Sequence, residues 1–174
     1  EADDILQYRL SKLIQEGPSN ELNITNHAQP AIFTVSVAIA KVAAQECGLK
    51  DFELLAGHSL GEYTAFWASN SLDFATCIKL LSIRGSAMAN AIVPGISSMV
   101  AVLGLEKIVI NNILNKSKTR GDTCVVANHN SPDQVVISGH QSALLRFMEV
   151  AKEYNPKRMI PLNVSAAFHS PLMQ

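Results

Sequence analysis

The apolar positions in the first half of the chain repeat at helical spacing. The first run ends at Gly17-Pro18 and predicts a helix, with apolar residues Ile5, Leu6, Tyr8, Leu10, Leu13 and Ile14. The second run, residues 31–46, is apolar nearly all round, which is typical of a buried helix. Pro30 can open this helix at its first position, and Gly48 can end it in a left-handed conformation.

The next segments predict a strand, a turn and two further helices. Residues 52–56 form a short apolar run typical of a buried strand, and a helical pattern follows at residues 60–69. Asp73 is a suitable N-cap for another helix, which should end before Pro94-Gly95. Its apolar stripe consists of Phe74, Cys77, Ile78, Leu81 and Met88.

The pattern changes from Met99 onward. It predicts, in order, a strand, a helix, two strands, a helix and a strand, at residues 99–103, 106–116, 123–127, 135–138, 141–154 and 158–163. This β-α-β-β-α-β succession is the ferredoxin-like order, which can bury a small core of its own. We therefore expect a ferredoxin-like inserted subdomain at residues 97–163, within a catalytic α/β domain formed by residues 1–96 and 164–174.

Composition limits the possible classes of protein. With 48% hydrophobic and 17% charged residues, the chain should be globular, and a net charge of −1 provides no field that would attract nucleic acid or anionic lipid. The longest apolar stretch, residues 30–44, contains Lys41 and is too short to span a bilayer. Three widely spaced cysteines indicate neither a disulfide framework nor a zinc site. We expect a soluble, cytoplasmic protein without a nucleic-acid or membrane partner.

The strongest chemical signal is Gly57-His58-Ser59-Leu60-Gly61 between the predicted strand and helix. A serine in this context lies on a sharp turn with its hydroxyl projecting, and the flanking glycines let strand and helix approach closely. The N–H of Leu60, at the helix N-terminus, is placed to stabilise an oxyanion. The alternative is an ordinary tight turn with a buried serine.

A nucleophilic serine needs a base, and five histidines are available. His169 is the best candidate because it follows the last strand of the insert, where the chain returns to the main domain. His58 adjoins the serine, so its ring should point elsewhere and orient or line the site. His27, His129 and His140 occupy turns or loops, where solvation or local hydrogen bonding is usual.

Arg84 is unusual because it lies in the middle of a predicted helix, at the edge of the apolar stripe, and precedes Gly85. A glycine inside a helix costs about 1 kcal/mol relative to alanine, so a packing reason or a close approach is expected there. Arg84 either pairs with a carboxylate or extends its head group to solvent, and the sequence leaves both open.

These motifs together closely resemble the malonyl-CoA:acyl-carrier-protein transacylases over nearly all 174 residues. The matching segments are Gly57 to Glu62, Arg84-Gly85 with Met88, Asn128 to Pro132 with Gln134 to Gly139, Phe168 to Met173, and Gln29-Pro30-Ala31. The resemblance implies a hydrolase-like parallel-sheet main domain carrying the ferredoxin-like insert. That family opens with a GQGSQ-type loop and continues past the histidine, so we expect this chain to be part of a longer protein.

The resemblance also implies residue roles. Ser59 is the acylated nucleophile, His169 the general base and acid, Arg84 the bidentate partner of the malonyl carboxylate, and the N–H of Leu60 an oxyanion donor. Five further residues should bind substrate or brace the site: His58, Gln29, Met88, Asn130 and Phe168.

The implied reaction is a ping-pong transfer that feeds fatty acid synthesis. The malonyl group passes from malonyl-CoA to Ser59, and then to the phosphopantetheine thiol of an acidic acyl carrier protein. No metal or bound cofactor is expected. The alternatives are an acyltransferase domain of a polyketide synthase, a hydrolase of the same fold class, and a catalytically incomplete module that binds carrier protein.

Overall fold

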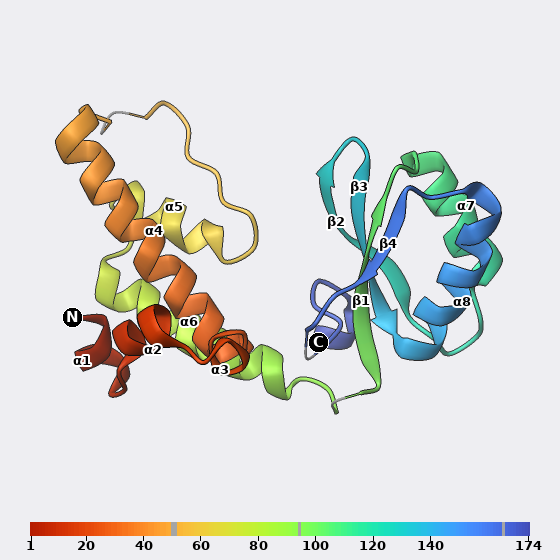
Figure 1. Cartoon of the computed structure of the whole chain (residues 1–174), viewed down its shortest axis with the longest axis horizontal. Coiled ribbons are helices and arrows are strands. Elements are labelled where there is room, and N and C mark those ends of the chain that lie inside the picture. Colours follow the sequence, from red (N-terminus) through yellow and green to blue (C-terminus); the bar gives the residue numbers. More distant parts are fainter. Residues whose placement is uncertain (50–51, 94, 165) are drawn as a thin grey trace. The chain divides into compact units, whose positions relative to one another are not determined.

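A computed structural model describes residues 1–49, 52–93, 95–164 and 166–174. The chain divides into two compact units, Glu1–Ala87 and Met88–Gln174, and each is considered by itself. The elements of both are labelled in Figure 1.

Unit 1 consists of helices in its described residues. They are α1 (Ala2–Leu6), α2 (Leu10–Glu16), α3 (Ser19–Leu22), α4 (Thr25–Cys47), α5 (Gly61–Ala68) and α6 (Phe74–Asn90), whose last residues continue into unit 2. The first predicted helix is split at Gln7, which has a left-handed φ of 60°. Asp73 caps α6 as predicted, because its Oδ1 accepts a hydrogen bond from the Thr76 N–H at 2.6 Å. The predicted end of α6 lies partly outside the described residues, at Pro94.

Helix α4 begins earlier than predicted. It starts at Thr25, so Pro30 lies inside the helix and not at its first position. Pro30 is the sixth residue of α4 and lies beyond the N–H groups that lack a partner at a helix start, so it removes one backbone hydrogen bond from the first turns of the helix. The C-terminal prediction is confirmed, since Gly48 follows α4 with φ 67°.

Only one side of α4 is buried, contrary to the prediction of a helix buried all round. Phe33 and Val37 pack in the core of unit 1 together with Ile78 and Leu81 of α6. The opposite side exposes an apolar stripe formed by Ile32, Val35, Ile39 and Val42. The expectation that this apolar stretch is too short to span a bilayer is wrong, because the helix has 23 residues and is long and apolar enough by those two criteria. The core helix of a soluble protein passes the same test. Unit 1 covers one side of α4 and leaves the stripe uncovered.

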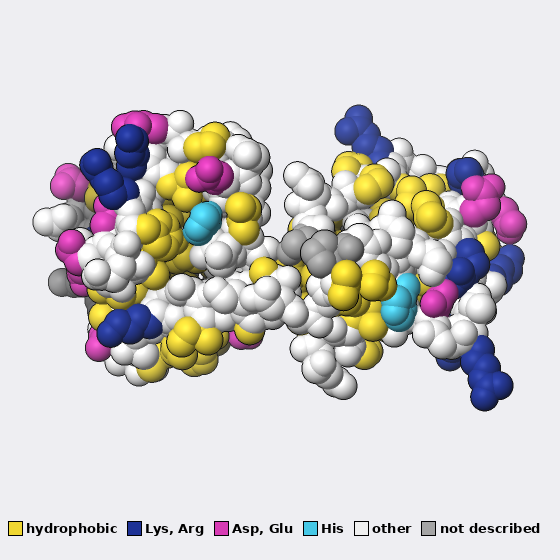
Figure 2. All heavy atoms as spheres, turned by 90° about the horizontal axis from the view of Figure 1, so that it is seen from below, with side chains coloured by type: hydrophobic (Ala, Val, Ile, Leu, Met, Phe, Trp, Pro, Cys, Tyr) yellow, Lys and Arg dark blue, Asp and Glu magenta, His cyan; other side chains and the backbone are white. Residues whose placement is uncertain are grey.

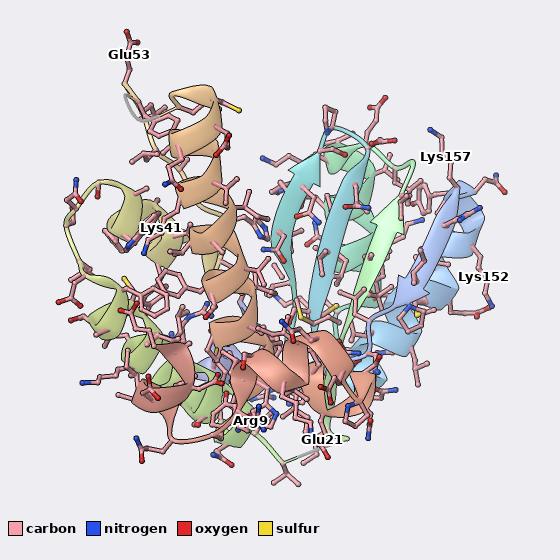
Figure 3. All side chains as sticks on the ribbon, turned by 60° about the vertical axis from the view of Figure 1, so that its left-hand side comes forward. Arg9, Glu21, Lys41, Glu53, Lys152 and Lys157 are labelled. Carbon is pink, nitrogen blue, oxygen red and sulfur yellow. The ribbon has the colours of Figure 1, made fainter. Side chains whose placement is uncertain are left out.

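The strand predicted at residues 52–56 does not form. Leu54 is 85% exposed, and Glu53 points away from the helices (Figure 3). A strand needs a neighbour that satisfies its backbone N–H and C=O groups, and the described residues of unit 1 supply none. For the same reason, the parallel sheet predicted for the main domain is absent from the described part of the chain.

Unit 2 has the predicted β-α-β-β-α-β succession. Its elements are β1 (Ser97–Leu103), α7 (Lys107–Ser117), β2 (Cys124–Ser131), β3 (Gln134–His140), α8 (Gln141–Ala151), a short 3-10 helix (Lys152–Tyr154) and β4 (Arg158–Pro161). The strands form a sheet of order β2-β3-β1-β4 in which each pair of neighbours is antiparallel.

The two faces of this sheet are covered differently (Figure 1). Helices α7 and α8 cover one face, where Ile110, Ile137 and Phe147 are fully buried. The C-terminal segment packs on the other face, where Ala166 and Phe168 contact the cluster around Met99. The second face therefore positions the segment that carries His169.

Candidate active site

The Ser59 turn has the strained geometry expected of a nucleophile. Ser59 has a left-handed φ of 54°, which is uncommon for a residue other than glycine. A Cβ added to Gly57 would lie 2.0 Å from the backbone carbon of Gly61, so this position requires glycine. The predicted need for glycine at Gly61 is wrong, because a Cβ there would meet no described atom within 4 Å.

Helix α5 begins directly after the serine. Leu60 is its N-cap residue with φ −60°, and it packs against the core of unit 1. The first N–H groups of a helix have no partner within that helix and carry its positive end. The backbone N–H of Leu60 therefore lies beside the nucleophile, in the part of the helix suited to an anion.

Arg84 connects Ser59 to the start of α4. Its Nη1 donates to Oε1 of Gln29, which is only 4% exposed, and its Nη2 donates to Oγ of Ser59 at 3.1 Å. Among the described residues, the guanidinium contacts an amide and a hydroxyl and does not simply extend to solvent, and its pairing with a substrate carboxylate stays a prediction. Gln29, α6 and the Ser59 turn thus converge on one guanidinium.

Gly85 explains how α6 comes close enough to α4 for this contact. Gly85 is buried, and a Cβ there would lie 2.6 Å from Cα of Asn26 and 2.9 Å from the carbonyl oxygen of Thr25. Any larger residue would therefore push the start of α4 away. The predicted close approach at Gly85 is confirmed.

The arrangement favours an anionic acyl group attached to Ser59. A guanidinium fork matches a carboxylate with two parallel hydrogen bonds, and it stays charged at any relevant pH. Because Nη2 already lies 3.1 Å from Ser59 Oγ, a short acyl chain on that oxygen can bring its own carboxylate to the arginine. Gln29 fixes the guanidinium from the other side.

His169 belongs to unit 2, where its backbone is tightly constrained. It has a left-handed φ of 56° and is exposed, and it follows Phe168, which is 9% exposed. Ser170 Oγ donates to the carbonyl of Ala167 at 2.6 Å and accepts the N–H of Leu172 at 3.3 Å. Of the predicted segment around His169, Ser165 lies outside the described residues.

The remaining predicted residues divide between the two units. His58 is exposed beside Ser59, whereas Met88 packs with the cluster that contains Phe168. Asn130 is exposed near the end of β2, and its Nδ2 donates to Oε1 of Gln134 at 3.0 Å. The structure therefore brings Gln29, Arg84 and Ser59 together in unit 1, and it groups Met88 and Phe168 beside His169 in unit 2.

The prediction that the other histidines occupy turns or loops is wrong, because His27 lies in α4, His129 in β2 and His140 at the end of β3. Two of them do have local hydrogen-bonding contacts. His27 Nδ1 lies 3.0 Å from the carbonyl oxygen of Glu21, and His140 Nδ1 accepts the N–H of Thr123 at 2.8 Å. Among the described residues, no group of three His, Cys, Asp or Glu side chains is arranged to hold a metal ion.

Two residues on the sheet face that bears the histidine segment were not among the predicted site residues. Ser97, which is 5% exposed, accepts the N–H of Ala167 at 3.0 Å. A β-bulge at Ala127 shifts the register so that Asn128 pairs with Val136 and shares the face on which Val136 packs. Asn128 could have been found from the sequence, because it belongs to the Asn-His-Asn motif. Ser97 could not, because nothing in the local sequence distinguishes it from any other serine at the start of a strand.

The chain, with a serine held on a strained turn beside a helix N-terminus and an arginine, belongs to the family described as the acyl transferase domain, whose model matches residues 3–174. The resemblance to malonyl-CoA:acyl-carrier-protein transacylases is confirmed. The chain is 41% identical over 174 residues to the malonyl CoA-acyl carrier protein transacylase of Haemophilus influenzae and 40% identical to that of Bacillus subtilis, and it covers 55% and 54% of their lengths.

Solved structures that resemble this chain include malonyltransferases. An acyl carrier protein S-malonyltransferase from Vibrio cholerae matches 99% of the chain with a TM-score of 0.90 and 41% identity, over 56% of its own length. A malonyl-transacylase in complex with a type II PKS acyl-carrier protein matches with a TM-score of 0.92 and 41% identity, over 55% of its own length. The chain thus spans about half the length of the relatives that it matches.

Proposed function

We propose that the protein transfers the malonyl group of malonyl-CoA to the phosphopantetheine thiol of an acyl carrier protein, in support of fatty acid synthesis. The observation that carries this proposal is the contact of Arg84 with Ser59 Oγ at 3.1 Å. It places a carboxylate-binding cation beside the nucleophile, which suits an acyl group with a free carboxylate. A hydrolase of neutral esters would have no use for this arginine.

The reaction proceeds in two half-steps. Ser59 Oγ attacks the thioester carbonyl while His169 takes its proton, the Leu60 N–H stabilises the oxyanion, and the C–S bond breaks. The departing thiolate of coenzyme A takes the proton from His169. In the second half-step, the carrier thiol gives its proton to His169 and attacks the malonyl ester, and Ser59 Oγ leaves and recovers the proton.

The carrier protein is acidic in this proposal, and unit 2 offers exposed basic residues to it. Lys118, Arg120 and Arg158 are exposed. Lys116 and Lys157 are already paired, with Glu153 at 3.6 Å and Asp133 at 3.7 Å, respectively. Lys157 projects from the sheet near β4 (Figure 3). Basic and acidic side chains are interspersed on the molecular face that is visible in Figure 2. Lys118, Arg120 and Arg158 form no ion pair within the described part of the chain, so they are the better candidates.

The fold of the whole protein is part of the proposal. We infer a hydrolase-like catalytic domain that includes residues 1–96 and 164–174, with a ferredoxin-like insert at residues 97–163. The antiparallel order β2-β3-β1-β4 supports the insert. The exposed stripe on α4 and the exposed residues 52–56 support a parallel sheet, because both offer apolar surface that further strands of the longer fold could cover. In this setting α4 is a core helix of a cytoplasmic protein.

An acyltransferase domain of a polyketide synthase is the second candidate. It is favoured by the relative that was solved in complex with a type II PKS acyl-carrier protein. Both candidates use the same chemistry, so the identity of the carrier that accepts the malonyl group separates them.

Intact-mass spectrometry of the full-length protein tests the proposal. Mixing with malonyl-CoA should add one malonyl group at Ser59, and adding carrier protein should remove it. Ser59→Ala should fold normally and gain no malonyl group. An adduct of undiminished yield on Ser59→Ala, or one mapped to another residue of the parent, contradicts the assignment. Unchanged acylation of His169→Ala removes the histidine from its role as base. A parent that binds carrier but never acquires the group would instead be a carrier-binding module.

A further inference from the structure

We propose that Ser97 is a positioning residue for His169. This inference rests on the proposed role of His169 as the base. Ser97 is the first residue of β1, and its Oγ accepts the backbone N–H of Ala167 at 3.0 Å. The bond joins residues separated by 70 positions in the sequence and lies two residues before the histidine.

The burial of both partners gives this bond its importance. Ser97 is 5% exposed, and Ala166 and Ala167 are fully buried. A buried backbone N–H that loses its acceptor cannot turn to water, so the segment has to move to satisfy it. The bond therefore specifies where the Ala167 peptide sits on the sheet.

The next peptide group, between Ala167 and Phe168, is held as well. Its carbonyl oxygen accepts a hydrogen bond from Ser170 Oγ at 2.6 Å, and the Phe168 N–H donates to the carbonyl of Ala166 at 3.0 Å. Ser97 and Ser170 thus hold the two peptide groups on either side of the Ala167 Cα, and Phe168 packs on the sheet next to them. His169 projects from this clamp with φ 56°, a backbone conformation that persists only when its surroundings enforce it.

Side-chain alternation on β1 supports a dedicated role for Ser97. Ser97, Met99 and Ala101 share one face, and Met99 and Ala101 pack with Phe168. Ser98 points to the opposite face, toward the helices, and pairs with Gly139. Adjacent serines of one strand therefore differ in their relation to the histidine segment, which makes Ser98→Ala a matched control.

Two measurements on the full-length protein test the inference. Hydrogen exchange at the Ala167 amide reports how firmly the segment is held, and it should accelerate about tenfold in Ser97→Ala. The rate of malonyl-Ser59 formation reports the position of the base, and it should fall at least about tenfold with KM unchanged, since a well-placed base contributes roughly 10² to 10⁴. Ser97→Thr keeps the acceptor oxygen and should recover most of both losses, whereas Ser98→Ala should match the parent.

Every outcome bears on the proposal. Unchanged Ala167 exchange in Ser97→Ala shows that the bond does not hold the segment. Faster exchange with an unchanged acylation rate shows that the held segment does not position the base, and an equal loss in Ser98→Ala shows a general effect on the fold. If the parent forms no malonyl-Ser59, the proposed function fails, and Ala167 exchange alone still decides whether Ser97 holds the segment that carries His169.

Discussion

Replacing Arg84 tests whether the site selects carboxylated acyl groups. Arg84→Ala removes two contacts at once, the bond to Ser59 Oγ at 3.1 Å and the bond to Gln29 Oε1. A malonyl group on Ser59 would then have its carboxylate in a partly buried site without a cationic partner. An acetyl group has no carboxylate and loses no such contact.

The size of the effect follows from the partners involved. Breaking a buried ion pair from one side costs about 3 to 5 kcal/mol, which corresponds to roughly 10² to 10³-fold or more in kcat/KM for malonyl-CoA. The fold also loses the hydrogen bond from Arg84 to the amide oxygen of Gln29, a residue that is only 4% exposed. An unsatisfied buried acceptor destabilises by about 1 to 3 kcal/mol, so denaturation must be measured for each variant.

The assay compares acylation by malonyl-CoA and by acetyl-CoA. Arg84→Ala should lose malonyl transfer and leave acetyl transfer unchanged or improved, and Arg84→Lys should fall between the two because lysine lacks the fork. Arg9→Ala is the control, since Arg9 is an exposed arginine of the same unit (Figure 3). A parallel loss for both substrates would mean that Arg84 supports the fold and not the choice of acyl group.

Two predictions concern stability. Gly85→Ala should destabilise the protein by about 1 to 3 kcal/mol despite the better helix propensity of alanine, because the new Cβ would lie 2.6 Å from the backbone of α4. Chemical denaturation should show this loss, and the control Gly61→Ala should be as stable as the parent. A Gly85→Ala variant that is as stable as the parent would refute the close approach. Burial raises the pKa of the Cys124 thiol to about 11, so the unfolded chain releases this proton first and stability falls as pH rises above the ordinary thiol pKa. The free energy of unfolding, measured by urea denaturation between about pH 8 and pH 10.5, should therefore fall more steeply with pH for the parent than for Cys124→Ala. Parallel curves for the two proteins would contradict a raised thiol pKa at Cys124.

The elements of unit 2 could be predicted because their signals are local. The short apolar runs within residues 99–103 and 135–138, and the helical spacing between them, depend only on neighbours in the sequence. The strands at β1 and β3 accordingly lie within two residues of their predicted bounds. The bulge at Ala127 escaped prediction because the register of β2 is set by pairing with β3 and not by β2 itself.

The segment 52–56 shows the opposite case. Its apolar composition resembles that of a buried strand, yet strand formation depends on a partner that no local pattern can supply. Pro30 is a similar example: it was predicted to begin the helix, but the residues before it are also helical, so α4 begins at Thr25.

By itself, the sequence determined the chemistry available at the site: a serine between glycines, an arginine next to a glycine, and a histidine after the last strand, each recognisable from adjacent residues. Only the tertiary structure decided that Gln29 and Ser59 converge on Arg84, and that Ser97 holds the peptide before His169. These contacts join residues 55, 25 and 70 positions apart, and hydrogen bonds of that range arise from packing, which local sequence patterns do not encode.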